Sequence, residues 1–524
     1  MANGQHPIMK ALRDWPKWLV AGLVLSLLLA PLLALLSQLG GQTQALHWPY
    51  VRSLVRFTLW QALLSTLLSA AIGLLLARML ARRSFHGRTL LLSWLDACFV
   101  MPSLVVVLAV VMTFRPSGSV GQFLGDGWRL YGLNGILLAH VFLETPLFVR
   151  VFLARLQQMP AGYLRQARLL GFNDWQMWRV LDWPAIKPAL PSVLMMVFLL
   201  CLTSFTVVLS LGGGPRATTL EVAIYQALRF EFDPIQAVKL ALLQLGLAAS
   251  LSLLLLPALM RPLPASRSQQ GLRPEGQRLS AYLQDALAWA LLLLLWLWPI
   301  WVLLSNARWP LLVPLLQDPA YWQAVRSSLL LGLGSAGLTL VLSLVLLGGR
   351  GRLALLLSYG ILLMPAVVLA TGSFLLIWPL NPGAQLRLGL LILLNALLVM
   401  PFAVKMLRPA KLALTQAYGR QMQLLGMNLW QRWRWVYWPC LLPNLGQAFG
   451  LCFMLAIADL AATLLLATPQ MNTLALMLYR LLGSHQLPLA IWLAFSLVVL
   501  GVLVNWAVQG MAKVWGAKRY GAGH

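Results

Sequence analysis

The chain has 524 residues, of which 60% are hydrophobic and only 10% are charged, and its formal net charge is +26. Soluble domains carry roughly a quarter charged residues, and a water-soluble chain this apolar would expose large apolar patches. The composition therefore excludes an ordinary soluble protein and indicates a chain with many membrane spans. The basic residues form short clusters between apolar runs rather than one face or a tail, so we expect no nucleic-acid partner.

Apolar runs follow one another along the chain, and a bilayer span needs about 20 such residues, so we expect an all-α polytopic membrane protein with about twelve transmembrane helices. In the first half the runs lie near residues 18–38, 54–77, 91–113, 133–154, 192–211 and 236–259. In the second half they lie near 282–304, 325–347, 354–378, 388–407, 443–467 and 488–510. The first run is too long and too leucine-rich for a cleaved signal peptide, so we expect it to remain as a span.

The Lys and Arg residues gather after every even-numbered run. These clusters lie within residues 78–88, 155–187, 261–278, 350–352, 405–434 and 513–519. Cytoplasmic connections of membrane proteins carry an excess of Lys and Arg. The pattern therefore predicts that both termini lie in the cytoplasm.

One polar sequence motif occurs twice in the chain. Residues 165–184 read RQARLLGFNDWQMWRVLDWP, and residues 420–439 read RQMQLLGMNLWQRWRWVYWP. TTLEVAIYQAL at 218–228 likewise parallels NTLALMLYRLL at 472–482. These pairs indicate an internal duplication of six spans, and an even number makes both copies enter the membrane in the same sense, as in parallel transporter repeats.

The duplication predicts a three-part organisation. The first half covers residues 1–260, and the second half covers residues 282–524. Residues 261–281 begin with a polar stretch that contains prolines and has no periodicity, so we expect a cytoplasmic linker there.

Both repeated loops fall on the predicted cytoplasmic side. Gly171 and Gly426 lie mid-pattern, where glycine allows a sharp turn between two short helices. Pro184 and Pro439 are expected to end the element. A helix–turn–helix that projects from the membrane face is suited to insertion into another protein. The alternative is an amphipathic helix that lies on the lipid headgroups.

The loop resembles the signature of permease subunits of binding-protein-dependent ABC importers: a Glu-Ala-Ala triplet, a glycine and then Ile-x-Leu-Pro. The counterparts are Arg165-Gln166-Ala167, Gly171 and Leu181-Asp182-Trp183-Pro184 in the first half, and Arg420-Gln421-Met422, Gly426 and Val436-Tyr437-Trp438-Pro439 in the second. Arg replaces the Glu in both copies, so no salt bridge from that position is carried over.

Two such loops in one chain resemble the fused double permeases of ferric iron and thiamine systems. The block CLTSFTVVLSLGGGPRATTLEVAIYQAL at 201–228, with HVFLETP at 140–146, is most similar to the thiamine importer permeases. This resemblance implies a type I ABC importer fold in the bacterial inner membrane. It also implies that thiamine or its phosphates cross by alternating access.

The resemblance also implies the partners. A periplasmic binding protein would deliver the substrate, and two copies of a cytoplasmic ATPase would bind ATP and Mg and contact the loops. This chain itself would hold no cofactor. The residues implied to couple to the ATPase are Arg165, Gln166, Ala167, Gly171, Phe172, Trp175 and Pro184, with Arg420, Gln421, Gly426, Met427, Trp430 and Pro439.

Catalytic and metal-binding patterns are missing from the sequence. The six histidines are scattered, with no Ser/His/Asp arrangement, and the four cysteines lack metal-ligand spacing. The glycine run at 212–214 is not followed by the lysine of a phosphate-binding loop. We therefore expect a transport subunit without an enzymatic centre or metal site, and ATP hydrolysis in a separate chain.

Three of the 13 acidic residues fall inside or close to predicted spans: Asp96, Glu144 and Asp459. A carboxylate in the bilayer core costs several kcal/mol unless it is paired or wetted, so each is a candidate to line the path of a cation such as thiamine. Phe205 could add a cation–π contact. The alternative is a structural ion pair, such as Glu144 with Arg150.

His140 and Asn395 occupy equivalent positions in the two halves and are expected to hydrogen-bond between helices. Two rival functions stay open from the sequence. The first is an importer of the same class with another cargo, namely ferric iron, sulfate or a polyamine. The second is an ion-coupled secondary transporter, which would need charged sites in broken helices but no paired cytoplasmic loops.

Overall fold

The computed structural model describes residues 22, 24–37, 47–83, 85–254, 279–347, 361, 364–380, 383–468 and 471–520. Within these ranges the chain is helical and has no strand. The predicted linker falls almost wholly outside the described residues, as does most of the first half of the predicted span near 354–378.

The described helices confirm an all-α polytopic architecture. Eight of them are long and apolar enough to cross a membrane, and two bent helix pairs raise the number to ten. Shorter apolar helices cover Val24–Ser37, Ala366–Leu380 and Leu474–Gly483. Each of the twelve predicted runs thus contains helix within the described ranges, and twelve spans stays a prediction.

The chain forms two compact units. The α2 unit contains residues 45–226 and 246–308, and the α17 unit contains residues 1–44, 227–245 and 309–524. These units cut across the two halves of the sequence. The helix Val24–Ser37 groups with second-half residues, and the helix that begins at Leu279 groups with first-half residues.

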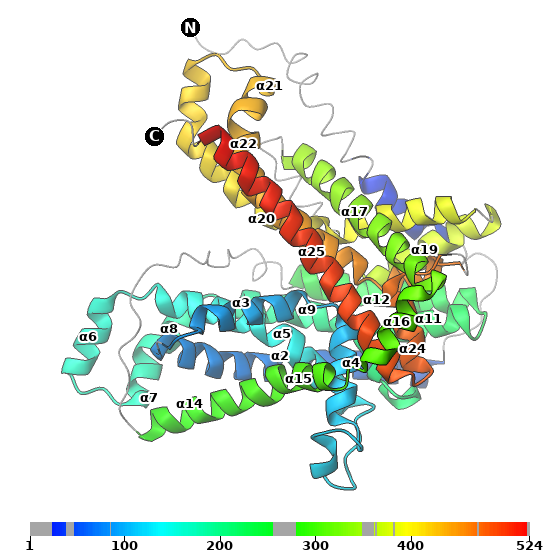
Figure 1. The fold of residues 1–524 in the computed structure, drawn as a ribbon, viewed down its shortest axis with the longest axis horizontal. Coiled ribbons are helices and arrows are strands. Elements are labelled where there is room, and N and C mark those ends of the chain that lie inside the picture. The colour runs from blue at the N-terminus through cyan, green and yellow to red at the C-terminus, as the bar shows by residue number, and fades with distance from the viewer. Residues whose placement is uncertain are drawn as a thin grey trace. The chain divides into compact units, whose positions relative to one another are not determined.

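The α2 unit begins with two long helices and a bent pair, α2 (Trp48–Arg82), α3 (Arg88–Val100), α4 (Ser103–Phe114) and α5 (Leu133–Gln157). The repeated loop follows as α6 (Ala161–Leu169), α7 (Asp174–Met177) and α8 (Trp183–Ile186). Then come α9 (Leu190–Leu202), α10 (Phe205–Leu211), most of α11 (Leu220–Arg229), the end of α12 (Pro234–Leu254), α14 (Leu279–Leu292) and α15 (Trp298–Ser305). Helices α2, α3, α5 and α14 lie side by side, and α6, α7 and α8 lie together beyond one end of this bundle (Figure 1).

A stripe of small and polar residues on α2 forms the centre of this unit. Thr58, Ala62, Ser65 and Ser69 are fully buried, and their spacing places them on one helix face. One turn further on, a Cβ on Gly73 would come within 2.5 Å of the Cβ of Phe148. Small residues let membrane helices approach closely, which explains why α2 packs along α5.

Helices α14 and α15 are held in the α2 unit by specific contacts. Trp296 is fully buried, and its indole N–H donates to the carbonyl oxygen of Phe142 at 3.0 Å. Arg83 Nε lies 2.6 Å from Asp285 Oδ2. The buried Trp296 and the Arg83–Asp285 salt bridge together hold the predicted first span of the second half against helices of the first half.

The α17 unit contains a second bundle. Its helices are α16 (Leu312–Gln317), α17 (Pro319–Leu347), α19 (Ala366–Ile377), α20 (Ala384–Leu424), α21 (Leu429–Arg432), α22 (Trp438–Ile457), α23 (Ala461–Leu466), α24 (Leu474–Gly483) and α25 (Leu487–Tyr520). Helices α17, α20, α22 and α25 pack together, and α21 lies beyond one end of them (Figure 1). Pro31 of the helix Val24–Ser37 lies against Gly372 of α19, where no space is left for a Cβ.

The predicted span near 91–113 is not straight. Helices α3 and α4 meet at an angle of 106°. Met101 at the break is extended, with φ −62° and ψ 135°, and Pro102 follows it. Proline lacks the N–H needed to continue a helix and favours an extended residue before it, so the Met-Pro pair breaks the span.

The internal duplication is visible in the hydrogen bonds. Thr58 Oγ1 accepts from the amide of Leu220 at 3.1 Å, and Ser328 Oγ accepts from the amide of Leu474 at 2.9 Å. Each bond joins the second helix of a half to the first amide of the helix that carries the TTLEVAIYQAL-like repeat. The two halves thus repeat a tertiary contact, which supports a duplicated fold.

Candidate functional site

The first repeated loop is a helix–turn–helix. Helix α6 ends at Leu169, and Gly171 has φ +67°. The amide of Phe172 donates back to the carbonyl oxygen of Ala167 at 3.0 Å, which is the helix end that a left-handed glycine produces. Asn173 then caps α7 reciprocally with Gln176, so the turn and the next helix start are fixed locally.

The second repeated loop has the same glycine turn and the same helix cap. Gly426 has φ +60°, and the amide of Met427 donates to the carbonyl oxygen of Met422 at 3.1 Å. Asn428 and Gln431 exchange two bonds of 2.8 and 2.9 Å, as Asn173 and Gln176 do. The sharp turns predicted at both glycines are confirmed. The two short helices predicted around each turn occur only in the first loop, because α20 runs unbroken from Ala384 to Leu424 before the second turn.

The two closing prolines do not end the element, and that prediction is wrong. A five-residue π-helical segment, Trp178–Asp182, precedes Pro184, and another, Trp433–Tyr437, precedes Pro439. Each proline then sits in the first turn of the next helix, α8 or α22. Proline clashes with the carbonyl four residues earlier, and the widened turn of a π-helix removes that conflict, so the chain continues.

Both loops carry exposed apolar side chains on otherwise polar segments. The exposed fraction reaches 89% for Leu169 in the first loop and 81% for Leu424 in the second. Of the predicted coupling residues, Arg165, Gln166, Gly171, Trp175, Pro184, Arg420, Gln421, Gly426 and Trp430 are exposed, Phe172, Met427 and Pro439 are half-buried, and Ala167 is buried. The buried Ala167 and its counterpart Met422 face inward, so each loop presents one outward face.

A buried ion pair ties the first loop to α2. Arg78 Nε lies 3.1 Å from Asp182 Oδ2, and the two side chains are 13% and 1% exposed. The guanidinium also lies 5.1 Å from the centre of the Trp178 ring. A charge pair this buried is costly to break on one side, so the loop and the end of α2 are expected to move together.

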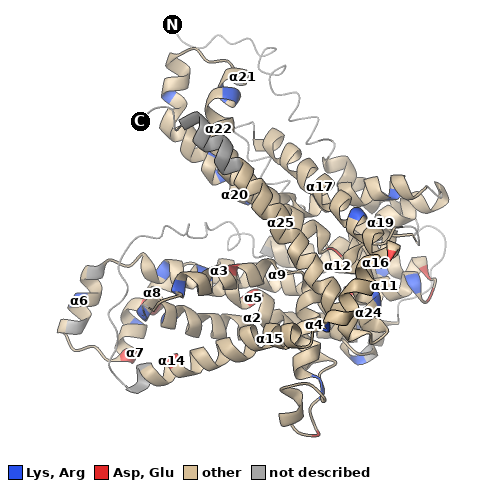
Figure 2. Ribbon diagram, in the orientation of Figure 1, with Lys and Arg blue, Asp and Glu red and all other residues tan. Residues whose placement is uncertain are grey.

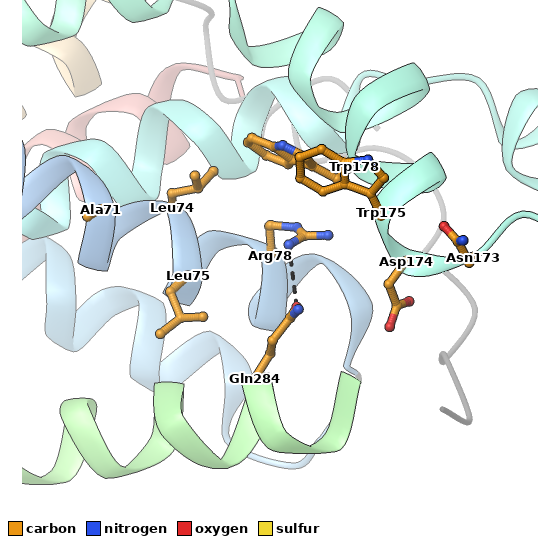
Figure 3. A pocket seen from close by; sticks show the side chains of 9 residues that line it. All are labelled: Ala71, Leu74, Leu75, Arg78, Asn173, Asp174, Trp175, Trp178 and Gln284. Carbon is orange, nitrogen blue, oxygen red and sulfur yellow. Dashed lines mark hydrogen bonds between the residues drawn. The ribbon is translucent and has the colours of Figure 1, made fainter. Parts of the chain in front are cut away.

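A cavity of about 570 Å³ separates α7 from α2 and α14 beside this ion pair. In Figure 3 the guanidinium of Arg78 lies between Trp178 of the loop and Gln284 of α14. Its Nη1 donates to Gln284 Oε1 at 3.4 Å, the dashed contact of the figure. Figure 2 shows further Lys and Arg around α8, at the same end of this unit.

The second loop is anchored through different chemistry. Tyr437, the counterpart of Asp182, has its hydroxyl 3.2 Å from Thr415 Oγ1. The Nζ of Lys411 lies 5.5 Å from the centre of the same ring. Both partners lie on α20, the helix that leads into the loop, so the two loops share a shape but not an anchor.

The three acids predicted near spans have different environments. Asp96 lies 3.4 Å from Arg150 Nη1, with side chains 49% and 57% exposed. The ion pair suggested for Glu144 is therefore made by Asp96 instead. Glu144 is 9% exposed, and its Oε2 has no hydrogen-bond partner among the described residues.

His140 and Asn395 form the expected interhelical hydrogen bonds. Nδ1 of His140 lies 2.9 Å from Ser65 Oγ, and Nε2 of the same ring lies 2.8 Å from Ser204 Oγ. Asn395 Nδ2 donates to Asp459 Oδ2 at 3.4 Å. Ser204 separates α9 from α10, and Asp459 separates α22 from α23.

Each half thus has a broken helix, with the polar residue of the break bonded to a neighbouring helix. The acid stands at the break itself only in the second half. Asp459 is half-buried there, at the start of the short helix Ala461–Leu466, where a helix N-terminus favours a negative charge.

The comparisons with known proteins agree with this geometry. A family model described as "Binding-protein-dependent transport system inner membrane component" matches residues 69–267, which include the first loop. The thiamine transport system permease protein ThiP of Salmonella typhimurium is 35% identical over 93% of this chain and 94% of that protein. The chain belongs to the family of binding-protein-dependent transport system inner membrane components.

Two further relatives carry the same name. ThiP of Brucella melitensis is 36% identical over 90% of both chains, and ThiP of Haemophilus influenzae is 33% identical over 86% of this chain and 87% of that protein. Matches of this length cover both loops, so the chain is a permease of the fused double type. It is a multi-pass inner-membrane transport component whose family works with a substrate-binding protein and an ATPase.

Sequence reasoning missed one acid of this inner membrane component. Glu221 lies in α11, is 1% exposed and has no hydrogen-bond partner for either carboxylate oxygen among the described residues. We assigned residues 212–235 to a connection between spans, where a charge needs no explanation. The signal that could have found it is the helical pattern of EVAIYQAL, which places Glu221 and Tyr225 on one face.

Proposed function

We propose that this chain is the transmembrane permease of an ATP-driven importer that carries thiamine or a thiamine phosphate into the cytoplasm. The observation that carries the importer class is the pair of loops with the same glycine turn and the same Asn–Gln cap. Matches to thiamine permeases over nearly the whole chain support the cargo. The exposed faces of the two loops fit two copies of one ATPase subunit, because they present the same shape twice.

The orientation of the chain follows from charge. Lys and Arg concentrate at the loop end of α2, around α8, and cytoplasmic connections carry such an excess. We therefore assign the loops and both termini to the cytoplasm and the Trp48 end of α2 to the outer face. A periplasmic binding protein would deliver the substrate there.

Coupling between ATP and the path is proposed to run through α2. An ATPase that pushes on the first loop moves Asp182, which is bonded to Arg78 near one end of the helix. Toward the other end, Thr58 is bonded to the start of α11, about 30 Å away along the helix axis. A continuous helix such as α2 can transmit a push over its length, so we expect closure of the ATPase to change the outer part of the path.

The path itself is assigned to the acids that lack a basic partner. Thiamine carries a positively charged thiazolium ring, and a carboxylate in a low-dielectric path lowers the barrier to a cation. Glu144 and Asp459 fit this role, whereas Asp96 is already paired with Arg150. Phe205 stays a candidate for an aromatic contact with the cargo. The two acids do not occupy equivalent positions of the repeat, since Val399 is the counterpart of Glu144.

Uptake assays with chosen cargoes test the proposal. We expect proteoliposomes that contain this chain, its ATPase and its binding protein to accumulate labelled thiamine only with ATP inside. Unlabelled thiamine should block uptake, whereas ferric iron, sulfate and polyamines should not. Uptake of one of those cargoes instead would keep the importer class and contradict the cargo. Uptake driven by an ion gradient without ATP would favour a secondary transporter.

A further inference from the structure

Glu221 of α11 is a further buried acid, in addition to Glu144 and Asp459. Glu221 is 1% exposed, and both of its carboxylate oxygens lack a hydrogen-bond partner among the described residues. No described Lys, Arg or His lies within salt-bridge distance of it. An unpaired carboxylate in an apolar environment costs several kcal/mol, so a sequence that places one here needs a reason beyond stability.

The position of Glu221 sets it apart from the coupling loops. The amide of its neighbour Leu220 donates to Thr58 Oγ1 at 3.1 Å. Thr58 lies 20 residues before Arg78 on α2, so Glu221 is about 30 Å from the loop anchor along the helix axis. His140 bonds to Ser65, which lies between these two levels, so Glu221 and the His140–Glu144 region occupy successive depths.

A pair of aromatic rings lies about one helical turn from this acid. Tyr225 is one helical turn after Glu221 on the same face of α11. Its ring centre is 5.5 Å from that of Phe205, the first residue of α10, and the rings meet edge to face at 75°. The two side chains are only 7% and 3% exposed. A carboxylate beside two rings is the combination that recognises an organic cation, through charge and through the ring faces.

The link between α10 and α11 is rich in glycine. It begins Gly212-Gly213-Gly214, and Gly213 and Gly214 have φ of +69° and +134°. Residues with a Cβ rarely adopt these backbone conformations, so the glycines serve a backbone that turns sharply between the two helices. Phe205 lies before this turn, and Glu221 and Tyr225 lie after it, so a movement at the turn would separate the Phe205 ring from the other two groups.

The duplicated half lacks this combination. By the repeat alignment Ala475 replaces Glu221 and Leu460 replaces Phe205, whereas Tyr479 matches Tyr225. The helix start itself is repeated, since Ser328 caps Leu474 as Thr58 caps Leu220. The fold therefore does not require an acid at this position, and its presence in one half points to a ligand.

We propose that Glu221, with Tyr225 and Phe205, forms an outer binding site for the positively charged ring of the cargo. The site accepts an organic monocation when α10 and α11 separate, before the cargo reaches the level of Glu144. This inference rests on the proposed function, because it takes the cargo to be thiamine or a similar cation.

Uptake kinetics of a charge-neutral variant test the site in the full complex. Glu221→Gln keeps the shape and removes the charge, so the KM for thiamine should rise about tenfold or more, as loss of a buried charge pair predicts. An uncharged thiamine analogue, with a neutral ring in place of the thiazolium, should show less than a twofold change. Glu221→Asp should lie between the variant and the original protein.

Two further variants complete the test. Glu231→Gln removes an exposed acid two residues after α11 and should leave both KM values unchanged. Tyr225→Leu keeps the charge and removes one ring, so the KM for thiamine alone should rise, and this variant tests the site if Glu221→Gln does not assemble. An unchanged KM in Glu221→Gln and Tyr225→Leu, or an equal change for the neutral analogue, would overturn the inference.

The proposed function can fail separately. If the unaltered complex does not take up thiamine or another organic cation, the cargo assignment and this site are both contradicted. If it takes up thiamine and Glu221→Gln behaves like Glu231→Gln, only the site is contradicted.

Discussion

At the scale of single residues, the ion pair Arg78–Asp182 is proposed to transmit movement of the first loop to α2. Asp182→Asn removes the charge that balances a guanidinium of which only 13% is exposed. The cost in stability should be about 1–3 kcal/mol, because the Arg is left buried with a weaker partner. Thermal unfolding of the purified complex measures this loss.

The double variant Arg78→Met with Asp182→Leu separates stability from coupling. It should recover most of the stability, since apolar residues of similar volume replace buried ion pairs well, but ATP hydrolysis should no longer follow substrate delivery. Full recovery of substrate-stimulated hydrolysis would show that the pair is structural only.

Asp459 is the residue whose charge should matter most in the α17 unit. Asp459→Asn should raise the KM for thiamine about tenfold, because the acid stands at a helix break without a described basic partner and attracts the cation. Asp96→Asn serves as the matched control, since that acid forms a half-exposed pair worth at most about 1 kcal/mol. Equal effects of the two substitutions on KM would contradict a special role for Asp459.

The residue scale also shows what the sequence could and could not predict. Composition singled out Glu144 and Asp459 because acids are rare in apolar runs; in the structure Glu144 is buried and Asp459 is half-buried, and their role in the path stays a prediction. The sequence suggested Glu144 as the partner of Arg150 because both residues lie on the same helix. The actual partner, Asp96, lies on another helix. Glu221 was missed because α11 is short and lies outside the long apolar runs.

At the scale of elements, the left-handed glycines define the loops. Gly171→Ala and Gly426→Ala should each destabilise their turn by about 1–2 kcal/mol, the cost of a left-handed conformation for a residue with a Cβ. Nothing lies near the added Cβ at either position, so the effect is one of backbone strain. Co-purification with the ATPase should fall in both variants.

Gly162→Ala is the matched control for the first loop. Gly162 lies in α6, has no positive φ and likewise has open space around an added Cβ. This variant should bind the ATPase as the unaltered chain does. If all three alanine variants retain full ATPase binding, the turn geometry is not what the partner recognises.

Local sequence rules predicted some features of the loops but not others. The repeated polar stretch and the glycine turn were predicted from the sequence. The Asn caps follow from the same local backbone chemistry but were not predicted. The role of Pro184 was not, because a π-helical segment lets a proline start the next helix instead of ending one. Trp298-Pro299 follows the same rule after Leu293–Leu297, which makes the Trp-Pro pairs a recurrent device in this chain.

At the scale of the whole molecule, duplication predicted the architecture but not the grouping of helices. The first helix of each predicted half belongs to the compact unit built mainly from the other half. Periodicity cannot reveal this, since it shows that a helix buries a face and not which partner covers it. The contacts that decide it, such as Trp296 with Phe142 and Arg83 with Asp285, join residues far apart in the sequence.

The central claim is that this permease carries thiamine under the power of ATPase subunits that act on both loops. The most direct measurement is ATP-dependent uptake of labelled thiamine by proteoliposomes that hold the complete complex, compared with Gly171→Ala, Gly426→Ala and the double variant. The account predicts uptake by the original complex, reduced uptake in either single variant and almost none in the double variant. ATP hydrolysis without thiamine uptake in the original complex, or full uptake in the double variant, would contradict it.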